Sequence, residues 1–258
     1  LRRGFRIVVG GRIKAGKSTL LTALFGGQLQ FPSAATVCTS VPTRIVRGHQ
    51  GTRLIVTLKN DQTEIRLGSA ALDQFATKDG CRSQDVECIR MEWDHEGFPD
   101  GLEVVDTPGS QDINQERNVL ASEAVQNADL LLYAVAVSSG GAIQGPDFEA
   151  IRRFCRATEE KPLMVVLTMA DCCSSPSEMK ALVEQAQHHL HVDGFRNSTV
   201  VPCSALASLA SLDFHSSLRG DSTPHLDPKC LRKSVKQRIR SMGFSDRLNL
   251  TLSSQIHL

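Results

Sequence analysis

A glycine-bounded loop between a short apolar strand and an amphipathic helix constrains the fold of this chain more than any other feature. Residues 5–9 are rich in β-forming side chains, residues 11–18 read GRIKAGKS, and apolar residues recur at helical spacing over 20–25. Glycine at positions 11 and 16 permits torsions that turn successive backbone N–H groups inward, and the helix adds its positive N-terminal end. The segment predicts a strand, an anion-binding loop and a helix in that order.

The side chains of this loop suit a phosphate site. Lys17 can reach the β- and γ-phosphates of a nucleoside triphosphate, and Ser18 offers a hydroxyl ligand to Mg²⁺. Because the match to a phosphate-binding loop is complete and lies between a strand and a helix, a chance glycine turn is disfavoured. The nucleotide-binding residues predicted from the loop are Gly11, Lys14, Ala15, Gly16, Lys17, Ser18 and Thr19.

A second signature, DTPG at residues 106–109, follows the largely apolar run 102–105. Asp106 stands where its carboxylate can hold Mg²⁺ through water, and the N–H of Gly109 can contact the γ-phosphate. Alone, this tetrapeptide is an ordinary turn. Downstream of a phosphate loop it predicts a sensor of the metal and the γ-phosphate.

The loop between these two signatures, residues 32–43, reads PSAATVCTSVPT and is rich in hydroxyl groups. A threonine here can close over Mg²⁺ through its hydroxyl and hold the attacking water through its carbonyl, as nucleotide-sensing loops do. We predict Thr39 for this role, as both a metal ligand and a catalytic residue, with Thr36 second. The alternative is a surface loop with common hydroxyl residues.

Two later strand ends carry groups that can recognise a base. The run 163–168 ends in Thr168 and is followed by Asp171, and the run 199–203 is followed by Ser204 and Ala205. A carboxylate at 171 can accept hydrogen bonds from guanine N1–H and the exocyclic amine, while the second turn offers a backbone N–H to the guanine oxygen. Adenine cannot satisfy that pattern, and unpaired polar groups give strong selectivity. These four residues are therefore predicted to bind the nucleotide.

The order of elements predicts an α/β, three-layer P-loop NTPase fold with an extended, mixed and mostly parallel sheet and helices on both faces. The first half has β-rich runs at 42–47, 53–58 and 63–67, interpreted as added antiparallel strands, a short helix at 69–78 and strands at 86–93 and 102–105. The second half alternates helices at 116–127, 146–157 and 176–190 with strands at 130–137, 163–168 and 199–203. Ligands of such sheets bind at the carboxyl ends of the strands, where the motifs fall.

Composition and the start of the sequence limit the classes of protein to which this chain can belong. Lys and Arg total 29 against 28 Asp and Glu. The chain therefore lacks the net positive charge that would indicate a nucleic-acid partner. Eight cysteines without a CxxC pair predict reduced thiols in a cytoplasmic protein, without disulfides or zinc. No apolar run is long enough to span a membrane. Because the sequence begins at Leu1 and enters a strand at Phe5, we expect either a fragment of a longer protein or an isolated domain.

The chain divides near residue 212. We predict one domain over residues 1–212 and, over 213–258, a polar linker followed by a basic segment with apolar residues at helical spacing. A basic amphipathic helix of this kind is either solvated and docked on the domain, which we favour, or a surface for lipid or a partner.

The motifs together resemble the GTPase domain of the dynamin superfamily, and the bacterial dynamin-like branch is most similar. The resemblance spans roughly residues 4–210 and rests on residues 14–19, 38–44, 101–109, 128–129 and 168–171. The wide interval between the phosphate loop and Asp106 also fits, because such domains resemble a Ras-like core with strands inserted there.

That resemblance implies Mg²⁺-dependent hydrolysis of GTP to GDP, stimulated when two domains form a homodimer through their nucleotide faces. It also implies helical stalks that couple hydrolysis to membrane remodelling, hence peripheral membrane association, and it makes the segment after 212 a truncated neck or stalk. Carried over by residue, Lys17, Ser18 and Thr39 would hold the phosphates and Mg²⁺, Asp106 and Gly109 would sense the γ-phosphate, and Asp171 would read the base. Lys14 occupies the loop position from which relatives assist catalysis.

Two departures keep alternatives open. Relatives carry lysine where this chain has Met169, which affects affinity or base selectivity, and no glutamine directly follows Gly109. A nucleotide-dependent scaffold with little or no hydrolysis, and a relative that uses ATP, therefore stand beside the GTPase. A P-loop kinase is less favoured because the motifs serve no obvious acceptor site.

Overall fold

The computed structural model describes residues 4–29, 31, 41–69, 71–76, 82, 84–107, 127–137, 143–155, 162–205 and 207–209. Three predicted segments lie outside these residues: most of the hydroxyl-rich loop, most of the helix at 116–127, and the polar and basic segment at 213–258. The structure therefore tests the predicted core of the domain and leaves those segments as predictions.

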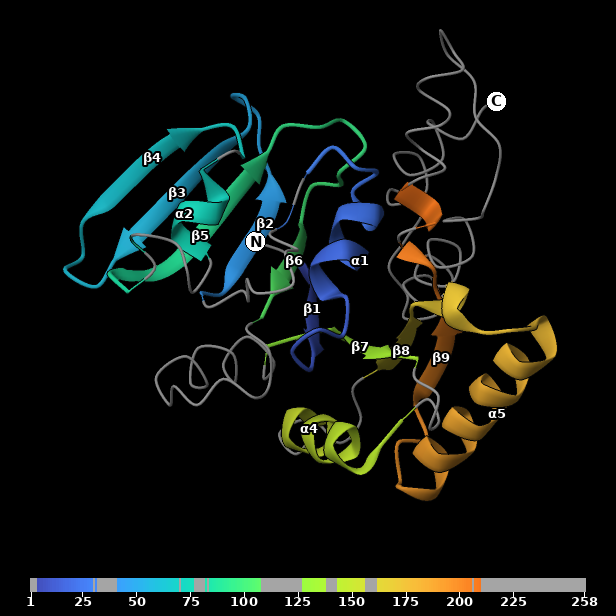
Figure 1. The fold of residues 1–258 in the computed structure, drawn as a ribbon. Helices are drawn as coiled ribbons and strands as arrows, with labels where there is room; N and C mark the ends of the chain where they lie inside the picture. The colour runs from blue at the N-terminus through green and yellow to red at the C-terminus, as the bar shows by residue number, and fades with distance from the viewer. Residues whose placement is uncertain are drawn as a thin grey trace, which may run out of the picture.

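In the described part of the chain, nine strands form one sheet in the order β4-β3-β5-β2-β6-β1-β7-β8-β9 (Figure 1). Their bounds are β1 (Phe5–Gly11), β2 (Thr43–Arg47), β3 (Arg53–Leu58), β4 (Thr63–Leu67), β5 (Val86–Trp93), β6 (Leu102–Asp106), β7 (Leu130–Ala136), β8 (Leu163–Thr168) and β9 (Ser198–Pro202). The central β1 runs parallel to β6 and β7, and β8 and β9 continue the parallel half. The predicted α/β class with an extended mixed sheet is confirmed.

Helices cover both faces of the parallel half. Alternation along β1 sends Ile7 and Val9 to one face, where they pack with α1 (Lys17–Leu24), and sends Val8 to the other, where it joins the core under α4 (Gly145–Cys155) and α5 (Pro176–Val192). β7 and β8 are almost wholly buried because both of their faces are covered. The sheet thus has two cores, one on each side.

The extension beyond β6 is covered differently. The short helix α2 (Leu72–Ala76) packs Leu72 and Phe75 on the same face as α1, over buried residues of β3 and β5. On the opposite face of this extension, none of the described helices packs, and ion pairs cross the strands instead, including Arg53 with Glu92 at 2.7 Å. Helices on both faces therefore hold for the parallel half, whereas the described extension has one helical face and one charged face.

The neighbour order in the extension differs from the chain order. β3 and β4 form the antiparallel hairpin expected from their spacing, and β2 is antiparallel to β6. However, β5 inserts between β2 and β3, antiparallel to β3 but parallel to β2. Central placement suits β5 because its alternate residues Ile89 and Met91 are fully buried, and Met91 lies between Ile45 of β2 and Leu54 of β3.

Local chemistry explains the bounds of α5. Its N-cap, Ser175, accepts a hydrogen bond from the N–H of Glu178 at 3.1 Å, and Pro176 occupies the first turn, where a missing N–H costs nothing. Gly194 follows the helix at a φ of 94°, so that the N–H of Phe195 bonds back to the carbonyl of Leu190. Among the described helices, none combines the length and apolar character that crossing a lipid bilayer requires.

A side chain of α5 protects one edge of the sheet. Gln187 accepts a hydrogen bond from the N–H of Val200 at 3.0 Å and donates one to the carbonyl of Ser198 at 3.1 Å. These are backbone groups of β9, the last strand of the sheet on this side. The amide therefore takes the place that a tenth strand would fill, which keeps the edge closed to other chains.

Replacing Gln187 tests this edge cap. We expect Gln187→Met to lower the free energy of unfolding by about 1–3 kcal/mol, because it leaves partly buried backbone groups without hydrogen bonds. The measurement is urea unfolding, combined with hydrogen exchange at the Val200 amide, which should become faster. Glu184→Met on the exposed side of the same helix is the control, and equal stabilities of the two variants would contradict the capping role.

Candidate nucleotide-binding site

The sheet brings the predicted site residues to one edge. Register places Val9 of β1 beside Asp106 of β6, and Gly11 beside Ala134 of β7. Thr168 ends the next strand, β8. Because these strands are parallel, their carboxyl ends meet. The glycine-bounded loop, the carboxylate predicted to bind metal and the segment predicted to read the base all leave the sheet there.

The loop after β1 has the torsions that the sequence required. Gly11 has a φ of 148° and lies so close to β7 that a Cβ atom there would approach the Ala134 oxygen to 2.6 Å. Gly16 has a φ of 75° and is the N-cap of α1, and Lys14 has a φ of 63°. The two glycines permit the curl of the loop, and the left-handed lysine stores about 1–3 kcal/mol of strain. This backbone, which ends at a helix N-terminus, fits a phosphate group.

Lys17 lies in the first turn of α1 and curls back over the loop. Its ammonium donates to the carbonyl oxygens of Gly11 and Arg12, each at 3.1 Å, and the residue is only 8% exposed. Burial of a cation is costly unless it is well solvated by polar groups. The ammonium is therefore held at the centre of the loop, in the position that a phosphate oxygen would contact.

Asp106 ends β6 as a buried carboxylate, 1% exposed. The next residue, Thr107, fixes the strand end by donating its hydroxyl to the carbonyl of Val9 at 2.8 Å. On the other side, register sets the buried Thr43 of β2 opposite Asp106. The carboxylate is thus held on the strand that adjoins the phosphate loop.

The oxygen donors at this edge suit Mg²⁺. Asp106 provides a carboxylate and Ser18, the second residue of α1, a hydroxyl, both hard ligands. Within the described ranges, no cluster of three or more His, Cys, Asp and Glu side chains could hold a metal.

The two base-reading segments are joined to each other. Asp171 lies in a short 3-10 helix, Ala170–Cys172, and its Oδ1 accepts a hydrogen bond from the hydroxyl of Ser204. The N–H of Ala170 also bonds the carbonyl of Cys203 at 3.3 Å. The structure therefore brings Asp171, Ser204 and the buried Ala205 together, as predicted.

Met169 occupies the turn between β8 and this short helix. Its φ of 59° is a left-handed torsion that is uncommon for a bulky residue. The side chain is partly exposed, and its Cε would lie 3.9 Å from a Cβ atom placed on Gly16. Met169 thus spans from the base-reading segment toward the phosphate loop. Nearby, burial raises the pKa of the Cys173 thiol, assisted by the charge of Glu178, so this thiol is protonated at neutral pH.

Thr168 takes a role that the sequence did not indicate. Its buried hydroxyl lies 2.8 Å from the carbonyl oxygen of Ala15 and 3.1 Å from that of Val135, and its single proton is shared between them. The contact of Thr168 with the nucleotide stays a prediction. In the structure its side chain fastens the phosphate loop to β7 and β8, which gives it a positioning role.

Sequence reasoning missed a second attachment of the loop. Arg12 pairs with Asp147 at 3.6 Å, and the buried Asp147 also accepts a hydrogen bond from the N–H of Gln144 at 3.3 Å. Asp147 lies in the first turn of α4, where a carboxylate complements the helix dipole. That helical position could be predicted, but its distance from the loop in sequence concealed the pairing. Thr36, Thr39 and Gly109 lie outside the described residues.

Removing the hydroxyl of Thr168 tests its fastening role. We expect Thr168→Val to lower the free energy of unfolding by about 1–3 kcal/mol, because the isosteric side chain leaves buried carbonyls without a donor. Nucleotide affinity should fall in parallel, since the loop loses its attachment. Calorimetric titration and thermal unfolding measure the two effects, with Thr199→Val on β9 as the control. Wild-type stability together with weakened nucleotide binding would show instead that the hydroxyl contacts the ligand.

Known proteins resemble this chain in sequence. A model of the dynamin family matches residues 7–170. A bacterial dynamin-like protein of Nostoc punctiforme is 28% identical over 144 residues, covering 52% of this chain and 20% of the relative. A protein of Caldicellulosiruptor sp., named as uncharacterised in the xynA 3′ region, is 25% identical over 138 residues, covering 53% and 34%. The chain therefore spans about a third or less of the curated relatives it matches.

A solved structure of another protein has a similar fold. In a structure described as an oligomerised bacterial dynamin pair that senses and tethers membranes, one chain superposes with a TM-score of 0.71 at 15% identity. The match covers 97% of this chain and 39% of the other. Because the family model covers more than half of the 258 residues, this protein belongs to the dynamin family, as its motifs predicted.

Proposed function

We propose that this domain binds GTP with Mg²⁺ and hydrolyses it to GDP and phosphate. The observation that carries the proposal is the convergence at one sheet edge of two buried charged groups: the Lys17 ammonium, held over the loop that follows β1, and the Asp106 carboxylate at the end of the neighbouring β6. A cation held inside a curled loop and an anion beside it suit a metal-bound triphosphate. Membership of the dynamin family supports the same activity.

Each protein group has a distinct part in this mechanism. Lys17 and the loop N–H groups bind the phosphate oxygens and stabilise the charge that develops as the phosphoryl group transfers. Ser18 and Asp106 would hold Mg²⁺, which, when bound, neutralises charge between the β- and γ-phosphates. Thr39 is assigned as a further metal ligand that orients water, and Gly109 as the γ-phosphate contact. Lys14 is assigned an assisting role, which its place in the loop supports.

Guanine is the base that the second half of the site favours. Asp171 can accept two hydrogen bonds from guanine while Ser204 holds its carboxylate in place, and the turn at Ser204 and Ala205 offers a backbone donor. A relative that uses ATP would leave these groups without partners. Competition between ATP and GTP for one site distinguishes the two nucleotides.

The domain organisation, dimerisation and membrane association of the protein are proposed from its similarity to relatives. We assign residues 1–212 to the GTPase domain and 213–258 to a linker and basic helix that belongs to a neck or stalk. A homodimer through the nucleotide faces, a cytoplasmic location and peripheral association with membranes agree with the oligomerised, membrane-tethering bacterial pair that shares the fold. No nucleic-acid partner is proposed, since the charges balance.

A nucleotide-dependent scaffold is the second candidate. The observation in its favour is Met169, which places a thioether rather than a cation in the base-reading turn. Such a domain would bind GDP tightly and turn GTP over slowly or not at all.

Substitution of Lys17 separates these functions. We expect Lys17→Ala to reduce phosphate release from GTP by about 10²–10³-fold, because it removes a preorganised charge at the transferring group. Lys180→Ala, an exposed lysine of α5, should keep the parent rate. Equal rates of the parent chain and Lys17→Ala above background would refute hydrolysis at this site. Tight GDP binding by a parent chain that shows no turnover at high protein concentration would favour the scaffold.

Substitution of Asp171 tests base recognition. We expect Asp171→Asn to weaken GTP binding by about 1.5–3 kcal/mol, because the amide cannot accept both guanine N–H groups. Xanthosine triphosphate should bind this variant better than GTP does, since its base carries a carbonyl where guanine carries the amine. Fluorescence competition measures both affinities, and Asp61→Asn in the β3–β4 turn is the control. An unchanged preference for guanine would remove Asp171 from the base site.

A further inference from the structure

The edge of the sheet at β4 is open in the part of the chain that the structure describes. There, β4 pairs only with β3, and it forms the outer limit of the extension (Figure 1). The N–H of Gly68 donates to Thr52 at 2.7 Å, and that of Leu58 donates to Gln62 at 2.8 Å. Since antiparallel ladders alternate, even-numbered residues of β4 bond β3 and odd-numbered ones point their backbone groups outward.

The outward-facing residues also carry apolar side chains. Ile65 is 55% exposed and Leu67 is 84% exposed. Both share one face of the strand with Thr63, because side chains alternate along it. This end of the sheet contrasts with the β9 edge, where Gln187 occupies the outward backbone groups. An open strand with exposed apolar residues is a template for pairing with another strand.

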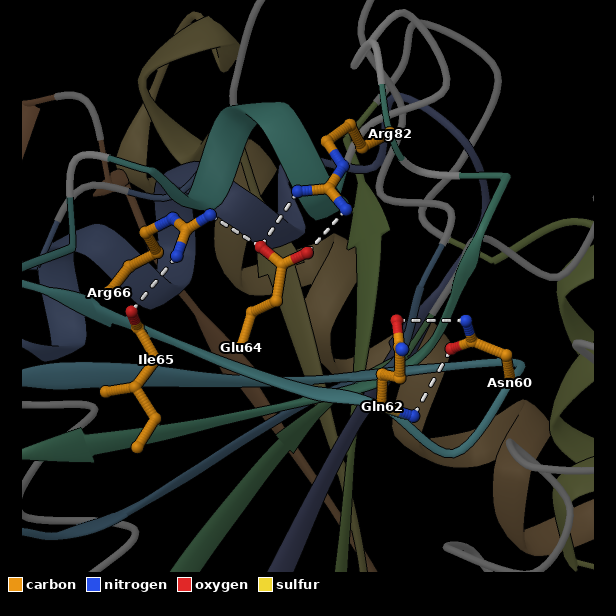
Figure 2. Close-up of polar contacts among 6 residues, drawn as sticks. All are labelled: Asn60, Gln62, Glu64, Ile65, Arg66 and Arg82. Carbon is orange, nitrogen blue, oxygen red and sulfur yellow. Dashed lines mark hydrogen bonds and ion pairs between the residues drawn. The ribbon is translucent and has the colours of Figure 1, made fainter.

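The opposite face of β4 is held by charged groups. Glu64 accepts hydrogen bonds from both Arg66 and Arg82, and the two guanidinium groups lie 6.0 and 5.5 Å from the ring centroid of Phe75 in α2. Figure 2 shows Glu64 turned toward this cluster and the side chain of Ile65 turned the other way. Hydrogen bonding to Arg82 lowers the pKa of Glu64, which therefore stays ionised at neutral pH. The strand thus presents fixed charges on one face and apolar groups on the other.

We propose that β4 pairs with β4 of a second copy of this chain, antiparallel and about a two-fold axis at Ile65. In that register the outward backbone groups of Ile65 in both copies face each other, and Thr63 faces Leu67 of the second copy. On the face toward α2, Glu64 lies beside Arg66 of the second copy, and the reverse holds by symmetry. In this one register, outward backbone donors face acceptors, Ile65 meets Ile65, and opposite charges lie side by side. A self-complementary surface of this kind is what an isologous interface requires.

Other registers satisfy fewer of these conditions. A two-fold axis at Thr63 sets Ile65 against Asp61 of the second copy, and an axis at Leu67 sets Arg66 against Gly68. Both lose the pairing of opposite charges, which contributes to cross-strand stability. The axis at Ile65 is therefore the specific arrangement.

Arg66 contacts one of the outward backbone groups of β4 in the single copy. In the single copy its guanidinium donates to the carbonyl of Ile65 at 3.2 Å as well as to Glu64 (Figure 2). In the pair, the Ile65 carbonyl accepts from the N–H of Ile65 in the second copy, and Arg66 moves toward Glu64 of the second copy. Because the lost contacts are replaced by equivalent ones, the exchange is close to balanced, and the association is weak and concentration-dependent.

This contact is distinct from a dimer through the nucleotide face. β4 lies five places from β1 in the strand order, at the far end from the phosphate loop. Two isologous faces on one domain link more than two copies. The β4 contact would therefore extend assemblies that nucleotide binding begins, but it does not depend on nucleotide.

The first experiment measures association without nucleotide. The whole chain is studied by sedimentation velocity with EDTA, at concentrations from micromolar to millimolar. We expect a reversible dimer, whose dissociation constant rises by about tenfold or more in Ile65→Pro and Ile65→Lys. Proline removes only an outward N–H, and the introduced lysines would meet at the two-fold axis. Val192→Lys, at a similarly exposed apolar residue of α5, should associate like the parent.

Circular dichroism checks that the variants fold, and hydrogen exchange locates the contact on the chain. Dichroism identifies any variant that fails to fold, and the remaining variant then carries the test. In the parent, the outward amides of Thr63, Ile65 and Leu67 should exchange more slowly as concentration rises, while amides away from β4 remain unchanged. A chain that stays monomeric at millimolar concentration, or an undiminished dimer in the folded Ile65 variants, overturns the proposal.

A double substitution tests the register. Leu67→Glu should weaken the dimer by removing an apolar contact with Thr63 of the second copy. Adding Thr63→Lys should restore it, because the introduced ammonium then faces the introduced carboxylate of the second copy across the two-fold axis. Equal dissociation constants for Leu67→Glu with and without Thr63→Lys would overturn the register at Ile65.

Discussion

Parallel pairing of β1 with β6 and β7 is the constraint on which the rest of this structure depends. It forces the carboxyl ends of three strands to the same edge, so that the loop bearing Lys17 and the carboxylate of Asp106 emerge side by side. The pairing needs close approach at the loop, which Gly11 permits because any Cβ atom there would strike the backbone of β7. The chemistry of the site is thus a consequence of strand direction.

The site is then fastened at several points by residues that need not touch a ligand. Thr168 ties the loop to β8, Arg12 ties it to α4 through Asp147, and Ser204 holds Asp171. Such contacts order the loops before a ligand binds. Binding therefore loses less conformational entropy than it would with mobile loops. Because they link the phosphate end of the site to its base end through β8, substitutions at either end are expected to be coupled.

The two edge strands of the sheet differ in how their outward backbone groups are covered. At β9, a helix returns over the edge and Gln187 takes up the outward backbone groups. At β4, the strands were added beyond the core, and α2 covers only one face of the extension. Charged groups around Glu64 stabilise that covered face, while Ile65 and Leu67 remain exposed on the other. The open end is therefore suited to a contact between molecules.

Local patterns in the sequence determined the elements, the phosphate loop and the candidate ligands. Periodicity located the strands and α5, and the glycines at 11 and 16 predicted the torsions found there. These features depend on near neighbours in the chain. The tertiary structure alone decided that β5 lies between β2 and β3, that Thr168 binds the loop, and that Arg12 meets Asp147. Each of these is set by long-range burial and pairing, which no local pattern encodes.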